Sequence, residues 1–153
     1  MKKAFDIIRG TIIVLAVILI GFFALLFVPQ MVNDAYLPSF RKEVLENFTL
    51  PEGSEMVEYV SSCGNSSGTG NHTDLYVAIL IKSSLGEDTI KEYYKDDEHY
   101  WRTWNTARLD TTRTFGMNCM NLEFETDIDK IEGYYILEYC KSAPLSWLDI
   151  RGC

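Results

Sequence analysis

The feature that most constrains this chain is an uncharged apolar stretch near its N-terminus, Gly10 to Val28. As an α-helix these 19 residues would be about 28 Å long, close to the thickness of the hydrocarbon core of a bilayer. A core helix of a soluble protein would carry a polar stripe every three or four positions, and this stretch has none. The sequence therefore predicts a transmembrane helix over residues 10–28.

The flanking charges predict its orientation. Three basic residues precede the stretch, whereas the first basic residue after it is Arg41. Because basic flanks stay in the cytoplasm, we expect residues 1–9 to be cytoplasmic and the rest of the chain to lie outside the cell membrane. The basic residues on the N-terminal side are Lys2, Lys3 and Arg9.

A cleaved signal peptide is the alternative reading of the same segment. The apolar region of a signal peptide is normally about 7 to 15 residues long and is followed by a cleavage site with small residues. This stretch is longer, and the candidate site at Asn33-Asp34-Ala35 has a poor residue three positions before the cut. The pattern favours an uncleaved anchor.

The remaining chain has the size and composition of one acidic domain. After a short juxtamembrane linker at residues 29–36, we expect an extracytoplasmic domain over residues 37–153. Residues 34–153 hold 11 basic and 21 acidic side chains, a net charge of −10. Such a surface would repel phosphates, so nucleic acid is excluded as a partner.

Two helices are predicted in this domain. Pro38 suits a first helical turn, and a helix to Phe48 would place Phe40, Val44 and Leu45 on one apolar face. A second helix is predicted from Leu85 to about Tyr94. It would begin at a capping box formed by Ser84 and Glu87.

Alternating apolar residues predict an antiparallel sheet. The strongest strand is Asp74–Lys82, preceded by a looser one at Glu55–Cys63, and the polar segment Gly64–Thr73 between them predicts a hairpin with a long tip. Gly133–Lys141 also alternates. We therefore expect an α+β fold in which a small antiparallel sheet has two helices packed on one face. Further strands are predicted at Phe115–Glu125 and Ser146–Arg151, and His99–Trp104 is compatible with either strand or helix.

All four cysteines follow the apolar stretch, in a compartment that permits disulfides. Cys119 and Cys140 lie on the more polar faces of two predicted strands, so a disulfide between them is plausible. Reduced structural thiols are the alternative. The other two are Cys63 and Cys153.

A cluster of aromatic residues is the strongest candidate for a binding surface. Its rings alternate with charged residues, a composition that suits sugar or protein recognition, although the same rings could fill the core between helix and sheet. The residues are Tyr93, Tyr94, Tyr100, Trp101 and Trp104. We expect any ligand or partner surface to include them.

The sequence predicts no catalytic constellation, cofactor or metal site. The only histidines are His72 and His99, and neither stands at a recognisable spacing from a serine or cysteine partner. A hydrolase built from scattered carboxylates such as Glu123, Glu125 and Glu138 is an alternative, because pairs in space are invisible in one sequence.

The N-terminus resembles that of type IV pilins and pseudopilins. These proteins have a short basic leader ending in glycine, an apolar N-terminal helix and an outer α+β domain, and Arg9-Gly10-Thr11 is similar to the leader junction. The resemblance implies a structural subunit of a filament. Leu15 stands where the family has glutamate, and Pro29 and Pro38 predict an interruption in what would be a long helix.

Taken together, these features favour a single-pass protein with an extracytoplasmic interaction or accessory domain. Its acidic exterior is compatible with a protein partner, or with a neutral or cationic ligand. The pilin-like subunit and the membrane-tethered hydrolase are the alternatives.

Overall fold

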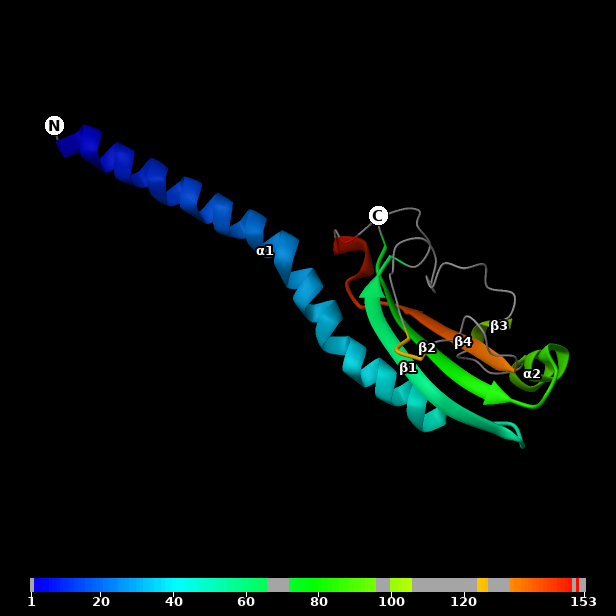
Figure 1. Ribbon diagram of the computed structural model, residues 1–153. Coiled ribbons are helices and arrows are strands. Elements are labelled where there is room, and N and C mark those ends of the chain that lie inside the picture. The colour runs from blue at the N-terminus through cyan, green and yellow to red at the C-terminus, as the bar shows by residue number, and fades with distance from the viewer. Residues whose placement is uncertain are drawn as a thin grey trace.

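The computed structural model describes residues 2–65, 72–95, 100–105, 124–126, 133–149 and 151. A long N-terminal helix projects from a small α+β domain, which is formed by an antiparallel sheet and a second, short helix (Figure 1).

The N-terminal helix α1, Lys2–Asn47, is continuous through both prolines. The predicted linker at residues 29–36 is therefore helical, and Pro29 and Pro38 do not interrupt the helix. A proline removes one backbone hydrogen bond and can bend a helix without ending it. Figure 1 shows that α1 bends along its length, and the bent half lies against the domain.

The described sheet has four strands in the order β1-β2-β4-β3, and all neighbours are antiparallel. The segment 99–104, which the sequence leaves open, contributes a strand. The predicted strand at Phe115–Glu125 lies outside the described residues, apart from its last two residues, which form no strand. The strands are β1 Ser54–Gly64, β2 Asp74–Ser83, β3 Tyr100–Asn105 and β4 Tyr134–Ser142.

Strands β1 and β2 form the predicted hairpin. Their pairing runs from Ser54 opposite Ser83 to Gly64 opposite Asp74. The hairpin tip therefore lies at the same end of the sheet as the end of β4, where Asp74 pairs with Ser142. This end of the sheet carries the candidate site described below.

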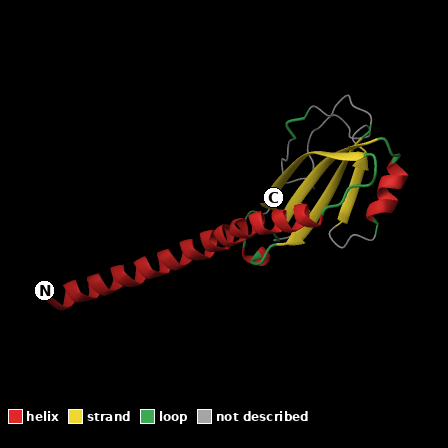
Figure 2. Cartoon of the chain, turned by 90° about the horizontal axis from the view of Figure 1, so that it is seen from below, coloured by secondary structure: helices red, strands yellow, loops and turns green. Residues whose placement is uncertain are grey.

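Both described helices contribute to one core cluster on one face of the sheet (Figure 2). Phe40 and Val44 of α1 and Ile90 of α2, Glu87–Tyr94, are buried against the alternate residues of β2 and β4. This confirms the predicted apolar face of the helical segment after Pro38. The strand residues in the cluster are Leu75, Val77, Ile79, Ile81, Tyr135, Leu137 and Tyr139.

The opposite face of the sheet is also buried. Tyr76, Ala78 and Leu80 of β2 pack with Phe124 in a second cluster. On this face the buried Tyr76 hydroxyl donates a hydrogen bond to Glu138 Oε1. The central strand β2 is thus covered on both sides, which explains its nearly continuous apolar sequence.

Two local predictions are wrong. The predicted capping box does not form: helix α2 begins at Glu87, its N-cap residue is Gly86, and no side chain caps it. The serine hydroxyl that accepts a hydrogen bond from a backbone N–H at this turn belongs to Ser83, and the donor is Leu85. The predicted C-terminal strand is instead a 3₁₀ turn, η2, Ser146–Leu148. Its backbone bonds are local, such as Leu148 N to Leu145 O, and so it does not join the sheet.

Candidate functional site

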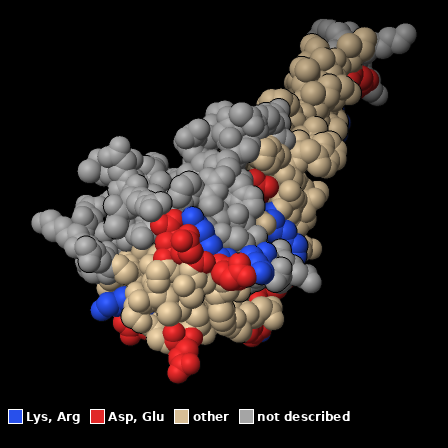
Figure 3. All heavy atoms as spheres, turned by 90° about the vertical axis from the view of Figure 1, so that its right-hand side faces the viewer, with Lys and Arg blue, Asp and Glu red and all other residues tan. Residues whose placement is uncertain are grey.

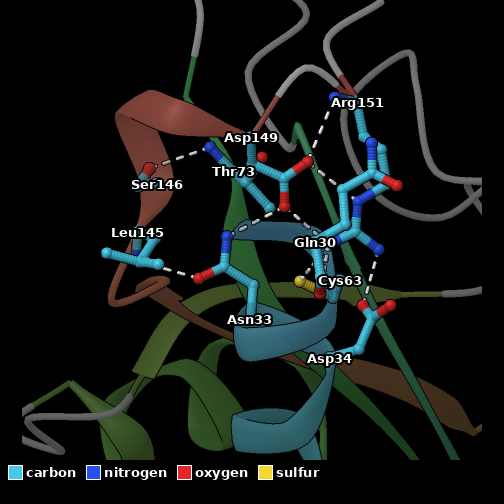
Figure 4. A network of polar contacts seen from close by, with 9 residues as sticks. All are labelled: Gln30, Asn33, Asp34, Cys63, Thr73, Leu145, Ser146, Asp149 and Arg151. Atoms are coloured by element: carbon cyan, nitrogen blue, oxygen red, sulfur yellow. Dashed lines mark hydrogen bonds and ion pairs between the residues drawn. The ribbon is translucent and has the colours of Figure 1, made fainter. Parts of the chain in front are cut away.

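The most extensively connected polar site lies where α1 meets the C-terminal segment of the chain (Figure 4). It joins the middle of α1, the end of β1 and the residues around η2. These segments are far apart in sequence, and the hydrogen bonds between them are mainly made by side chains.

The side chain of Asn33 is the centre of this network. Its Nδ2 donates to Asp149 Oδ2 at 2.8 Å, and its Oδ1 accepts from the backbone N–H of Leu145 at 2.9 Å. The residue is fully buried. The amide group thus uses both of its ends, one as a donor and one as an acceptor, to bind two groups of the C-terminal segment.

The position of Asn33 follows from the pattern of the helix. Asn33, Leu37, Phe40 and Val44 recur at spacings of four, three and four, so they share one face of α1. Phe40 and Val44 are in the core, and Leu37 packs against it. Asn33 is therefore a polar member of the buried face of α1, one turn after the buried Pro29.

The carboxylate of Asp149 is buried and accepts several hydrogen bonds. In addition to Asn33, it binds the backbone N–H of Arg151 at 3.1 Å and the guanidinium of Arg151 at 2.6 Å and 2.9 Å. Burial by itself would raise the pKa of Asp149. The hydrogen bonds from Arg151 and Asn33 outweigh it, and the pKa lies below its ordinary value.

The guanidinium of Arg151 connects three elements. It forms an ion pair with Asp34 of α1 at 2.5 Å and with Asp149, and its Nη2 approaches Cys63 Sγ of β1 at 3.4 Å. It also lies 3.5 Å from the carbonyl oxygen of Gln30. One cation is thus shared by the helix, the hairpin and the C-terminal segment, which suits a planar group with five donors.

The thiol of Cys63 is not poised for nucleophilic chemistry. Burial raises its pKa to about 11, and the nearby Arg151 guanidinium offsets only part of that effect. A reactive cysteine needs a lowered pKa, because the thiolate is the nucleophile. Within the described part of the chain, no three His, Cys, Asp or Glu side chains gather as a metal site. What the contacts of the network do show is that they connect α1, β1 and the C-terminal segment.

A second set of contacts holds the hairpin to the same C-terminal segment. The backbone N–H of Thr73 donates to the Ser146 hydroxyl at 2.8 Å, and the N–H of Ala143 donates to the carbonyl of Thr73 at 3.0 Å. His72 lies 3.4 Å from the carboxylate of the buried Asp74. His72 is thus placed beside a carboxylate at the start of β2.

The structure describes the side chains of two residues of the predicted binding surface. Tyr94 is buried in the core, where its hydroxyl donates to the Thr49 carbonyl at 2.7 Å, whereas Tyr93 is exposed. For Tyr94 the core interpretation holds. The side chains of the other three residues lie outside the described part, although their backbone forms β3, so a shared surface stays a prediction: Tyr100, Trp101 and Trp104.

The predicted disulfide also remains a prediction. Cys119 and Cys153 lie outside the described residues, and the described part of the chain contains no disulfide. Cys140 lies on the face of β4 opposite Tyr135, Leu137 and Tyr139, as its strand pattern predicted, and it is half-buried there beside the second core cluster.

A polar hollow of about 380 Å³ lies at the opposite end of the sheet. Its hydroxyl groups bind one another: Ser54 donates to Ser83 at 2.7 Å, and Ser83 accepts from the N–H of Leu85. Since these hydroxyls already have partners and no histidine lines the hollow, it offers no activated nucleophile. It is lined by Gly53, Ser54, Glu55, Lys82, Ser83 and Ser84.

Sequence reasoning missed Asn33, Asp149 and Arg151. Asn33 falls in the segment expected to be a linker, and the other two fall in an expected strand. The helical spacing of Asn33 from Leu37 and Phe40 is a signal that could have placed Asn33 in the helix. No local signal connects it with residues more than a hundred positions later.

No family model, curated protein or solved structure matches this chain. The function is therefore argued from the chain's own geometry and chemistry.

Proposed function

We propose that this protein is a single-pass membrane protein whose outer α+β domain is a non-catalytic interaction or accessory module. Residues 10–28 would be the anchor, with the N-terminus in the cytoplasm and the domain outside the cell membrane. The observation that carries the proposal is the contrast between the two halves of α1. Its apolar half is exposed along its whole length, whereas its other half is part of the domain core.

The side chains of the apolar half of α1 belong to neither core cluster of the described protein. Large apolar residues from Phe5 to Val28 are about half to two-thirds exposed, apart from the half-buried Leu26, and none of the most apolar 18-residue window is buried. In Figure 3 this half is mainly tan, whereas acidic and basic side chains gather on the domain. Exposing so much apolar surface to water would be costly, and a bilayer would remove that cost.

The buried network supports retention of the anchor over cleavage as a signal peptide. The candidate cleavage site, Asn33-Asp34-Ala35, lies inside α1, and its first two residues bind Asp149 and Arg151. A cut there would remove both side chains from the domain. The folded domain needs a helix that extends back to the end of the apolar stretch.

The network also fixes the domain close to the membrane. Asn33 lies five residues beyond Val28, a helical distance of about 7.5 Å. The domain is joined to α1 there by hydrogen bonds to Asn33 and an ion pair to Asp34. A module held in this way would present one face to a neighbouring membrane protein. Its net charge of −10 over residues 34–153 suits a protein partner with a neutral or basic surface, or a neutral or cationic ligand.

A pilin-like subunit is a second candidate, because α1 is one continuous helix. The two prolines were a departure from the resemblance, and the helix passes through both of them. A protruding apolar half and a second half packed on an antiparallel sheet would suit assembly through the apolar half. Leu15 remains at the position of the family's glutamate.

The hydrolase alternative has no comparable observation in its favour among the described residues. Glu138 is buried and accepts a hydrogen bond from Tyr76, and the backbone of the exposed Glu125 is bound by Glu58. Glu123 lies outside the described residues.

N-terminal sequencing of the protein purified from membranes distinguishes these possibilities. A protein with an uncleaved anchor retains residues 1–9, a processed pilin-like subunit begins at Thr11, and a protein whose signal peptide has been removed begins at Tyr36. Protease added to intact cells should digest the C-terminal domain if the topology is correct. Protection of the domain, with digestion of a known external control, would contradict it.

The partner is identified by site-specific photocrosslinking in native membranes. A photoreactive amino acid at the exposed Tyr93 should capture a partner if the aromatic surface is used, and one at the exposed Lys42 of α1 is the matched control. Equal capture at both positions, or none at Tyr93, would contradict a partner surface at Tyr93.

A further inference from the structure

We infer that Trp147, in the 3₁₀ turn η2, inserts into the headgroup region of the bilayer and is a second membrane contact of the domain. This inference rests on the proposed membrane anchor. In addition to its connection through α1, the domain would contact the lipid surface through an aromatic residue near its C-terminus.

The first observation is the exposure of Trp147. Its side chain is 73% exposed, the highest value of any large apolar side chain that the structure describes. In the described part of the chain beyond α1, the next value is 47%, for Tyr93. Moving the apolar part of such an exposed ring out of water is favourable, and its N–H can still bind water or a polar headgroup.

The second observation is the position of the turn. Figure 1 shows η2 on the side of the domain that faces the protruding half of α1, opposite α2. The turn is fixed there, because the N–H of Leu145 is 2.9 Å from Asn33 Oδ1 and the Ser146 hydroxyl accepts from Thr73 N at 2.8 Å. Trp147 follows these two anchored residues directly.

The third step is the depth of this turn along the membrane normal. If Val28 lies at the edge of the hydrocarbon core, Asn33 is about 7.5 Å beyond it along the helix. The headgroup region on each side of a bilayer is about 5 to 8 Å thick. The turn bound to Asn33 is therefore at the depth of the headgroups, where tryptophan and tyrosine are enriched because their rings are amphipathic.

Neighbouring residues of α1 are suited to the same region. Met31 is 70% exposed and Tyr36 is 53% exposed, and they flank Asn33 in sequence. Both of these exposed side chains lie within three residues of Asn33, the residue to which the turn is bound. Continuity with the apolar half of α1 makes the lipid headgroup region, rather than a soluble protein, the occupant of this surface.

The test measures the depth of Trp147 in vesicles that contain the full-length protein. The protein is reconstituted in phosphatidylcholine vesicles with bromine atoms at shallow or deep acyl positions, and tryptophan fluorescence is compared with that of Trp147→Phe. The difference between the two proteins reports Trp147 alone. We expect this difference to be quenched about twofold more by shallow than by deep bromines.

A matched control moves the probe to the other end of the domain. The double variant Trp147→Phe/Tyr93→Trp places a tryptophan at an exposed position on α2. Its added fluorescence should not be quenched by either lipid. Because both sites are exposed, neither change should affect folding, and equal resistance to protease in all three proteins checks this.

Two outcomes would overturn the inference, and they are distinguishable. If the protein floats with the vesicles but the Trp147 signal is insensitive to brominated lipid, the anchor stands and the second contact is wrong. If the protein does not float with the vesicles, the proposed anchor itself is wrong and the inference falls with it.

Discussion

The side-chain amide of Asn33, in the middle of the N-terminal helix, donates a hydrogen bond of 2.8 Å to the carboxylate of Asp149, 116 residues later in the chain. Both residues are buried. The bond connects the part of α1 that follows the apolar stretch with the C-terminal segment of the domain. Movement of one would therefore be transmitted to the other.

Replacing Asn33 with alanine should destabilise the domain by about 1–3 kcal/mol. The change leaves the part-buried Leu145 N–H without its partner and removes one of the hydrogen bonds to the buried Asp149 carboxylate. The measurement is urea unfolding of the purified protein in detergent, followed by circular dichroism.

The matched control for this experiment is Asn47→Ala. Asn47 is also on α1, but it is exposed and its side chain bonds only to Glu43 O in the same helix. We expect a change within about 0.5 kcal/mol for Asn47. Equal effects at the two positions would mean that the buried amide is not important for stability.

Replacing Arg151 with alanine should destabilise the domain by about 1–3 kcal/mol. The buried carboxylate of Asp149 would lose its main cation, and the cost is below that of a fully buried pair because the Arg151 side chain is 28% exposed. A thermodynamic cycle with Asp149→Asn measures the coupling. Additive effects of the two changes would show that the pair does not interact significantly.

The stability of the domain should fall in acid, and Asp149 should contribute to this fall. Its pKa is lowered in the folded protein, so the folded state binds the proton less readily than the unfolded state. The contribution is fully present above the ordinary aspartate pKa of about 3.9, and it is lost as the pH falls through the lower folded value.

Thermal unfolding between pH 7 and pH 3 measures this effect. Asp149→Asn should be less stable than the wild type at pH 7, and its stability should change less toward acid. Glu58 also has a lowered pKa, because hydrogen bonds from Glu125 and Thr126 outweigh the effect of its burial. It is present in both proteins, so it contributes the same dependence of stability on pH to each. Parallel pH profiles for the two proteins would contradict the role of Asp149.

The Cys63 thiol should react slowly with iodoacetamide. Its pKa of about 11, against an ordinary value of 9.0, leaves about a hundredfold less thiolate at pH 8. Mass spectrometry of the Cys63 peptide gives the rate, with urea-unfolded protein as the control. The rate in the folded protein should rise steeply between pH 9 and pH 11. Folded and unfolded protein reacting equally at pH 8 would show that burial does not protect the thiol.

Local patterns in the sequence accounted for the elements whose side chains repeat with a simple period. The β2 pattern of Leu75, Val77 and Ile79 predicted one buried face, and the apolar positions Phe40 and Val44 predicted the packed side of the helix. Both predictions are confirmed, because alternation and helical spacing reflect the geometry of a single element. The apolar stretch from Gly10 was equally readable, since its length and lack of charge need no tertiary context.

Local sequence signals were less reliable at positions where the conformation of the backbone depends on tertiary packing. Pro29 and Pro38 indicated breaks, but packing of the following turns keeps α1 helical. Ser84 matched a capping box, whereas Ser83 is the residue whose hydroxyl binds a backbone amide at this turn. A pattern read from a few neighbouring residues therefore did not determine the conformation at either place.

The sequence by itself determined that a long apolar helix precedes an acidic domain with an antiparallel sheet, because composition and periodicity act within one element. Only the tertiary structure decided that Asn33, Asp34, Cys63, Asp149 and Arg151 form one network. Hydrogen bonds between distant residues depend on where several elements pack in space. No spacing along the chain encodes that position.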